Sequence, residues 1–126
     1  MGRTILIVED CENTAALEIA LGKLPGVELV MKGNGRDARR FLEAGDVALS
    51  AMVTDLNLPY VDGFELIEMV RSHSRYAGVP IVVLSGNSSP DTPERLRLLG
   101  ANAFFAKPYS PAKVLETLEA LIDATY

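Results

Sequence analysis

Short runs of apolar, mostly β-branched residues alternate along the chain with segments in which apolar residues recur every three or four positions. The first pattern predicts strands and the second predicts helices. The strand-like runs cover residues 3–8, 27–32, 47–55, 79–86 and 102–108. The fourth run is the most thoroughly apolar, which is typical of a strand that is covered on both faces.

A helix-like segment follows each of these runs. The five segments cover residues 13–24, 35–44, 63–74, 94–100 and a last stretch that begins at Pro111 and ends near Tyr126. The apolar faces are expected to comprise Leu17, Ala20, Leu21 and Leu24 in the first segment, Leu66, Met69 and Val70 in the third, and Val114, Leu118 and Leu121 in the fifth. A strand and a helix repeated five times predict an α/β fold, a parallel sheet with helices on both faces.

Capping residues mark where these helices begin and end. The expected helix starts are Asn13 or Thr14, Thr92 with Pro93, and Ser110 with Pro111. Each offers a side-chain acceptor for the first free N–H groups, and the two prolines suit a first helical turn. Gly45 and Gly100 are expected to end the second and fourth helices. No repeat, low-complexity stretch or linker divides the chain, so one domain over residues 1–126, without an output domain, is expected.

Composition narrows the class of protein. The chain has 126 residues, 48% of them apolar, which is enough for one domain with a real core. The net charge of −5 argues against direct nucleic-acid binding, and no apolar run reaches membrane-spanning length. Cys11 is the single cysteine, which excludes an internal disulfide and fits a reducing compartment. A cytoplasmic protein is therefore expected.

Polar side chains collect where the strand-like runs end. Glu9 and Asp10 follow the first run, Asp55 ends the third, and Ser85 and Lys107 close the fourth and fifth. In an open α/β sheet, ligands bind beyond the carboxyl ends of the strands, so these groups are expected to converge. Three carboxylates at close range need a compensating cation, and Mg²⁺ with oxygen ligands suits them.

This set of groups favours phosphoryl chemistry. A cation, a lysine and a hydroxyl around Asp55 suit a dianionic phosphoryl group, and phosphoryl transfer needs an in-line nucleophile more than a protein acid or base. Asp55 is a candidate nucleophile that forms an aspartyl phosphate. The only histidine, His73, falls in the third helix, away from the strand ends. Asp55 is therefore expected to accept a phosphoryl group from another molecule.

Four motifs carry a family resemblance over essentially the whole chain. They are "VED" at residues 8–10, "TDLNLPYVDG" at 54–63, "VVLSG" at 82–86 and "AKP" at 106–108. In this order and spacing the sequence resembles the receiver domain of two-component response regulators. The resemblance implies a flavodoxin-like, doubly wound sheet with strand order 2-1-3-4-5. It also implies that the chain is a phospho-accepting switch rather than an enzyme, with self-phosphorylation and self-dephosphorylation as its only reactions.

The resemblance also implies roles for matching positions. Asp55 is the phospho-acceptor, and Mg²⁺ is held by Asp10, Asp55, the backbone carbonyl of Asn57 and, through water, Glu9. Ser85 and Lys107 contact the phosphoryl group, and the Lys107–Pro108 peptide bond is cis. Phe104 stands at the aromatic switch position, where many relatives have Tyr and therefore a hydroxyl contact that is missing here.

The implied partners are a sensor histidine kinase or a histidine phosphotransfer protein. Phosphorylation is expected to change the surface of the fourth helix, fifth strand and fifth helix, which then controls binding of an unknown target, or homodimerisation through that face. No membrane or nucleic-acid contact is expected. Whether the chain stands alone or is part of a longer response regulator or hybrid kinase stays open at this point.

Other functions fit the residues less well. A Mg²⁺-dependent phosphohydrolase usually has a second Asp two residues after the nucleophile, where this chain has Asn57. A flavin or nucleotide carrier needs a phosphate loop after the first strand, where "EDCENT" is acidic. A degenerate receiver would lack some of the acidic pair, acceptor, hydroxyl or lysine, all of which are present.

Single residues also have simpler interpretations. Asp55 before a Pro-containing loop can be a turn residue, Ser85 can be loop chemistry and Phe104 can be a packing residue. Of Phe104 and Phe105, which alternate, one is expected in the core. Tyr60 and Tyr109 are expected to be surface aromatics, and His73 an exposed helix residue.

Overall fold

Five parallel strands form one sheet with a helix after each strand. The computed structural model describes residues 3–9, 14–56, 61–86 and 90–125, without the side chains of the last two. The strands are β1 (Arg3–Val8), β2 (Val27–Lys32), β3 (Ala51–Asp55), β4 (Ile81–Ser85) and β5 (Ala103–Ala106). The helices are α1 (Ala15–Leu21), α2 (Gly35–Ala44), α3 (Gly63–Ser72), α4 (Thr92–Leu99) and α5 (Pro111–Thr125).

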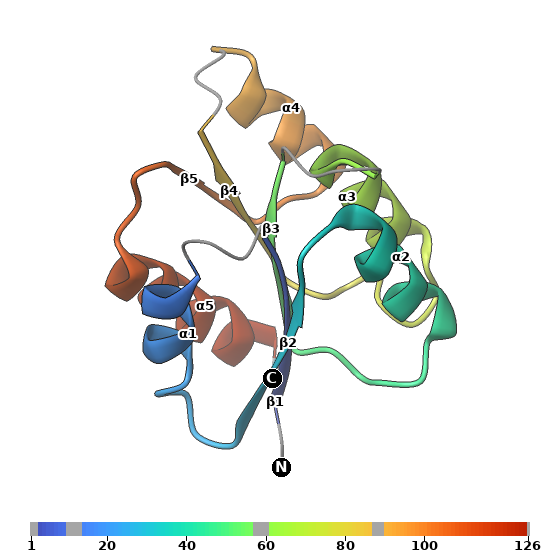
Figure 1. Cartoon of the computed structure of the whole chain (residues 1–126). Coiled ribbons are helices and arrows are strands. Elements are labelled where there is room, and N and C mark those ends of the chain that lie inside the picture. Colours follow the sequence, from blue (N-terminus) through green and yellow to red (C-terminus); the bar gives the residue numbers. More distant parts are fainter. Residues whose placement is uncertain (1–2, 10–13, 57–60, 87–89, 126) are drawn as a thin grey trace.

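The strand order is β2-β1-β3-β4-β5, which confirms the expected doubly wound α/β fold. β1 lies between β2 and β3, with Ile5 opposite both Leu29 and Ala51. Figure 1 shows α1 and α5 on one face of the sheet and α2 and α3 on the other. The chain therefore reverses its direction of winding between β1 and β3, and the carboxyl ends of these two strands lie side by side.

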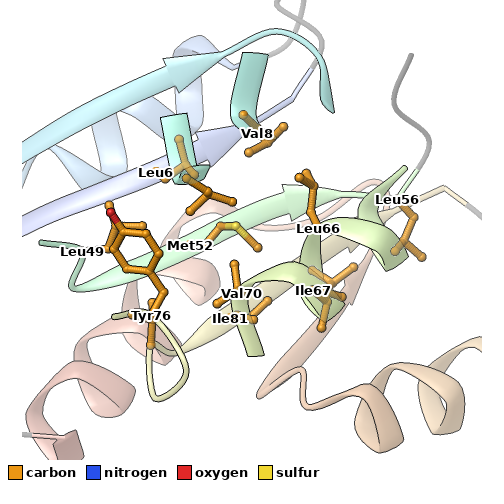
Figure 2. Packing of buried hydrophobic residues seen from close by; sticks show 14 of the residues in the cluster. Leu6, Val8, Leu49, Met52, Leu56, Leu66, Ile67, Val70, Tyr76 and Ile81 are labelled. Carbon is orange, nitrogen blue, oxygen red and sulfur yellow. The ribbon is translucent and has the colours of Figure 1, made fainter. Parts of the chain in front are cut away.

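Alternate residues of the strands point into two separate cores. The core on the α2–α3 side is built from Leu6, Met52 and Ile81 of the strands packed against Leu66 and Val70 of α3 (Figure 2). The core on the opposite side contains Ile5, Ile7, Ala51, Val53, Val82 and Leu84 together with Leu17 and Leu21 of α1 and Val114, Leu118 and Ile122 of α5. β3 and β4 are buried along their whole length, as expected for central strands covered on both faces.

Tyr76 is a core residue that the sequence pattern did not single out. It is fully buried between α3 and β4, and its hydroxyl donates to the backbone carbonyl of Val47 at 2.7 Å. His73 is half-buried rather than exposed as expected, because it lies just after α3 and its ring stacks on that of Tyr76 with centroids 4.7 Å apart. The pair joins the loop before β3 to the loop before β4, at the end of the sheet opposite the strand ends that carry the polar residues.

Several expected boundaries shift. The third strand begins at Ala51 rather than at residue 47, because its pairing with β1 starts only where Ala51 lies opposite Ile5. α3 ends at Ser72 rather than at 74, since His73 adopts an extended conformation. Thr92 is not the cap of α4; it lies in the first turn, buried, and Asp91 is the cap.

The caps of α1 and α5 and the buried face of α5 also differ from the expected ones in detail. Thr14 caps α1 without a side-chain hydrogen bond to the backbone, whereas Ser110 Oγ accepts from the N–H of Lys113 at 3.4 Å. In α5, Ile122 is buried and Leu121 only half-buried, so the stripe runs one position further than expected. No helix in the described part of the chain has the length and apolar character to cross a membrane.

Candidate functional site

Four of the expected site residues lie together at the carboxyl edge of the sheet. Glu9 follows β1, Asp55 ends β3, Ser85 ends β4, and Lys107 follows β5. The strand register brings them together, because Asp55 lies opposite Leu84 and Ser85 lies opposite Ala106 in neighbouring strands. Asp10 and Asn57 lie outside the described residues, so their expected roles stay predictions.

Lys107 joins the two described carboxylates. Its Nζ lies 2.5 Å from Asp55 Oδ2 and 2.8 Å from Glu9 Oε1, while its backbone N–H donates to the carbonyl of Ser85 at 2.8 Å. The peptide bond between Lys107 and Pro108 is cis. The lysine is therefore fixed by its backbone to β4 and by its ammonium to β1 and β3.

Both carboxylates are almost inaccessible to water. Glu9 is 3% exposed and Asp55 7% exposed, whereas the Lys107 side chain keeps 32% of its surface. Burial lowers the pKa of Lys107, but hydrogen bonds and charge interactions with Asp55 and Glu9 outweigh it, so its pKa is raised overall. The ammonium stays protonated at neutral pH and neutralises part of the buried negative charge.

The residues present fit a hard divalent cation. Glu9 Oε2 is buried and has no hydrogen-bond partner among the described residues, an arrangement that costs free energy unless a metal or a metal-bound water contacts it. The described donors are carboxylate oxygens, which Mg²⁺ prefers. Within the described residues no three His, Cys, Asp or Glu side chains gather closely enough to form a full ligand set.

Ser85 and Thr54 supply buried hydroxyls beside Asp55. Both are fully buried; Ser85 ends β4, and Thr54 directly precedes Asp55 on β3. Thr54 Oγ1 donates to the backbone carbonyl of Asp55 at 2.9 Å. Thr54 was not singled out from the sequence, although a hydroxyl inside an apolar run next to a candidate nucleophile is a signal that could have identified it.

Gly63 brings the start of α3 close to the end of β3. Its N–H donates to the carbonyl of Leu56 at 3.0 Å, and a Cβ at this position would lie 2.4 Å from the carbonyl oxygen of Asp55. Only glycine allows this close approach of helix and strand. The Gly of the "VDG" motif therefore positions α3 against the backbone of Asp55.

A mostly apolar hollow of about 520 Å³ opens beside the carboxylates. It is lined by Glu9, Ala16, Lys107, Pro108, Tyr109 and Pro111. Tyr109 is not a plain surface residue as expected; it is half-buried against the core between α1 and α5. Burial, followed by the charge of Glu9, raises the pKa of Tyr109. Tyr109 comes directly after Lys107 and Pro108, where the chain leaves β5 and turns back over the sheet. This position in the sequence could have indicated that its side chain is half-buried. Tyr60 lies outside the described residues.

The two phenylalanines of β5 belong to different cores. Phe104 is half-buried against the core on the α2–α3 side, and Phe105 is half-buried against the other core. The expectation that one of them is in the core is therefore incomplete, because the strand alternates and both faces of the sheet are covered. Phe104 lies opposite Val83 of β4, two residues before Ser85.

Comparisons with known proteins agree with this geometry. Residues 5–119 match the response regulator receiver domain family. GltR, a transcriptional regulatory protein of Pseudomonas aeruginosa, is 33% identical over 123 residues, which are 96% of this chain and 49% of GltR. DivK, a polar-differentiation response regulator of Brucella anthropi, is 27% identical over 126 residues and is covered to 98%, with 97% of this chain aligned. The chain thus spans about half of one relative and nearly all of another.

Solved structures resemble the fold over almost its full length. CheY4, a chemotaxis response regulator of Vibrio cholerae, superposes with a TM-score of 0.81 at 27% identity, covering 96% of this chain and 99% of CheY4. The receiver domain of a sensor histidine kinase from Pseudomonas aeruginosa, described with a magnesium ion coordinated in its active-site cleft, gives 0.82 at 29% identity, covering 98% of this chain and 99% of that one. Sequence, fold and the arrangement of Glu9, Asp55, Ser85 and Lys107 agree, and the chain belongs to the response regulator receiver domain family.

Proposed function

We propose that this chain is a signalling switch in which Asp55 accepts a phosphoryl group. The observation that carries the proposal is a nearly buried Asp55 carboxylate at the edge of the sheet, 2.5 Å from the ammonium of Lys107. Receiver domains are generally signalling switches rather than enzymes, and the only reactions proposed are self-phosphorylation and self-dephosphorylation. No observation in the described residues favours a phosphohydrolase.

The phosphoryl group is proposed to come from a phosphohistidine of a sensor histidine kinase or a histidine phosphotransfer protein. The bond between phosphorus and the histidine nitrogen breaks as a carboxylate oxygen of Asp55 bonds to phosphorus, and the imidazole keeps the electron pair. Lys107 already contacts Oδ2 and is placed to pair with the phosphoryl oxygens.

Mg²⁺ is the proposed cofactor, held by Asp10, Asp55, the backbone carbonyl of Asn57 and, through water, Glu9. When bound, the ion supplies positive charge that offsets the carboxylates and the incoming phosphoryl oxygens. The buried and unpartnered Glu9 Oε2, as far as the described residues go, supports an interaction of this kind.

The switch is proposed to act through Ser85 and Phe104. Phosphorylation adds about −1.5 to −2 charge and three acceptor oxygens. The Ser85 hydroxyl donates to one of them, and Phe104 turns toward the space that Ser85 leaves, which changes the surface of α4, β5 and α5. This works only if the phosphoryl group binds one arrangement better than the other.

The changed surface then controls a partner, and a homodimer through this face is one form of that control. The target is proposed to be either a separate protein or a further domain of a longer regulator. DivK, which this chain matches over nearly its whole length, is consistent with a separate target protein. GltR and the autoinducer sensor kinase/phosphatase CqsS of Vibrio cholerae are matched over only 49% and 17% of their lengths. These two are consistent with a further domain of a longer regulator.

The test is intact mass spectrometry after incubation with acetyl phosphate and Mg²⁺. One phosphoryl adduct is expected on the wild type and on Asp46→Asn, a control that removes an exposed carboxylate elsewhere. No adduct is expected on Asp55→Asn or when Mg²⁺ is chelated beforehand. An adduct on Asp55→Asn would overturn the assignment of the acceptor. A wild type that neither gains an adduct nor binds beryllofluoride, which mimics the phosphoryl group, would overturn the function.

A further inference from the structure

α4 is attached to the rest of the fold by few buried side chains. Of its eight residues, Thr92 and Leu96 are buried, while Leu98 is 72% exposed. The neighbouring helix α3 buries Gly63, Leu66, Ile67 and Val70. A helix with so little buried surface shifts its position at a lower free-energy cost than α3 does. Hydrogen bonds and other polar contacts therefore contribute a large part of what fixes the position of α4.

The C-terminal end of α4 is held by Arg71. This guanidinium, on α3, donates to the carbonyl of Gly100 from Nε at 3.1 Å and from Nη2 at 2.7 Å, directly after the last turn of α4. It also donates to the carbonyl of Val79 at 2.7 Å. This end of α4 is therefore fixed to α3 and to the start of β4, and freedom to move remains at the end nearer the phospho-acceptor.

A cation–π contact joins the first half of α4 to α3. The guanidinium carbon of Arg95 lies 4.0 Å from the centroid of the Phe64 ring. In the described part of α4, Arg97 also forms an ion pair with Glu94, and this pair stays within the helix. The Arg95–Phe64 contact is therefore the cation–π interaction that spans the two helices, which lie side by side in Figure 1.

The two sides of this contact differ in how firmly they are held. Phe64 directly follows Gly63, whose backbone is fixed against Asp55 and Leu56. Arg95 is exposed and sits on the weakly attached helix that follows β4 and Ser85. A displacement that starts at Ser85 would move Arg95 relative to Phe64, because the ring stays with the acceptor strand.

We propose that the Arg95–Phe64 contact is a latch that holds α4 in its unphosphorylated position. The inference rests on the proposed function, in which phosphorylation shifts this region. We take the described arrangement, in which Lys107 Nζ contacts Asp55 Oδ2 directly, as the unphosphorylated one. A contact made only in this arrangement lowers the fraction of molecules in the phosphoryl-binding arrangement, and the apparent affinity for the phosphoryl group falls by the same factor.

Removing the latch should therefore tighten phosphoryl binding. An exposed cation–π contact of ordinary strength corresponds to about a two- to fivefold change in an equilibrium constant. The test is calorimetric titration of the Mg²⁺-loaded protein with beryllofluoride. Arg95→Ala and Phe64→Leu are each expected to bind it about two- to fivefold more tightly than the wild type. The double variant is expected to bind about as tightly as either single one, since both remove the same contact.

Arg97→Ala is the matched control, because it removes one positive charge from the same helix without touching α3. It is expected to bind beryllofluoride like the wild type. A merely destabilised fold would not bind more tightly, so a gain in affinity reports the latch. If the wild type binds beryllofluoride and Arg95→Ala binds it equally or more weakly, the latch is overturned while the proposed function stands. A wild type that binds no beryllofluoride would overturn the proposed function, and the latch with it.

Discussion

Replacing Lys107 by Met tests whether the lysine stabilises the buried carboxylates. The substitution keeps a long unbranched side chain and removes the ammonium that lies 2.5 Å from Asp55 Oδ2 and 2.8 Å from Glu9 Oε1. Both carboxylates are less than a tenth exposed, so the loss of this charge leaves negative charge in a poorly solvated place. The free energy of unfolding is therefore expected to fall.

The magnitude follows from how much of the pair is buried. Removing one partner of a fully buried ion pair costs about 3–5 kcal/mol, whereas an exposed pair contributes about 0–1 kcal/mol. The Lys107 side chain is 32% exposed while both carboxylates are buried, which places this pair between the two cases. The expected loss is about 1–3 kcal/mol, or a shift of about 0.5–2 M in the urea midpoint of a domain this size.

Equilibrium urea unfolding in EDTA, followed by circular dichroism, measures this loss. Lys113→Met is the control, because Lys113 is 71% exposed and its closest recorded carboxylate oxygen, on Glu116, is 4.0 Å away; it is expected to change stability by less than about 0.5 kcal/mol. Mg²⁺ is then expected to stabilise Lys107→Met more than the wild type, since it replaces the missing charge. Equal midpoints for Lys107→Met and wild type in EDTA would refute the reasoning.

Three further variants test contacts between elements of the fold by the same unfolding measurement. Tyr76→Phe removes one 2.7 Å hydrogen bond to a backbone carbonyl and is expected to cost about 1 kcal/mol, so an unchanged midpoint would contradict the bond. Arg71→Ala removes donors to several backbone carbonyls and is expected to cost about 2–4 kcal/mol; a loss below about 1 kcal/mol would show that these hydrogen bonds do not hold the end of α4. Gly63→Ala puts a methyl group against the carbonyl of Asp55 and is expected to cost about 1–3 kcal/mol, whereas Gly78→Ala, with nothing within 4 Å, should be neutral; equal effects would refute the close approach.

The fold could be predicted from the sequence because its main signal is local. Each strand is an apolar run and each helix has a periodic face, and these patterns need no knowledge of distant contacts. The boundaries were less accurate where tertiary pairing decides them. Residues 47–50 continue the apolar run, but β3 begins at Ala51, where β1 offers a partner. Leu49 is still buried, so its apolar character reflects packing rather than strand pairing.

The candidate site could be predicted only in part. Polar residues at the ends of parallel strands converge for geometric reasons, which is why Glu9, Asp55, Ser85 and Lys107 were expected together. Their pairing is not local information. That Lys107 contacts both Glu9 and Asp55 depends on the relative placement of three strands, and the contact of Arg71 with Gly100 joins residues 29 positions apart. The half-buried position of Tyr109 likewise depends on how α1 and α5 pack.

The placement of the site explains how a stable fold tolerates an unfavourable cluster of charges. The buried apolar residues lie in two cores on either side of the sheet, and neither core includes Glu9 or Asp55. The carboxylates lie at the edge, where one lysine neutralises part of their charge and Glu9 Oε2 has no partner among the described residues. A cation or a change of charge at Asp55 therefore acts on groups that the cores do not fix. Since the backbone at Gly63 holds α3 against Asp55 while α4 buries little, we expect such a change to shift α4 rather than α3.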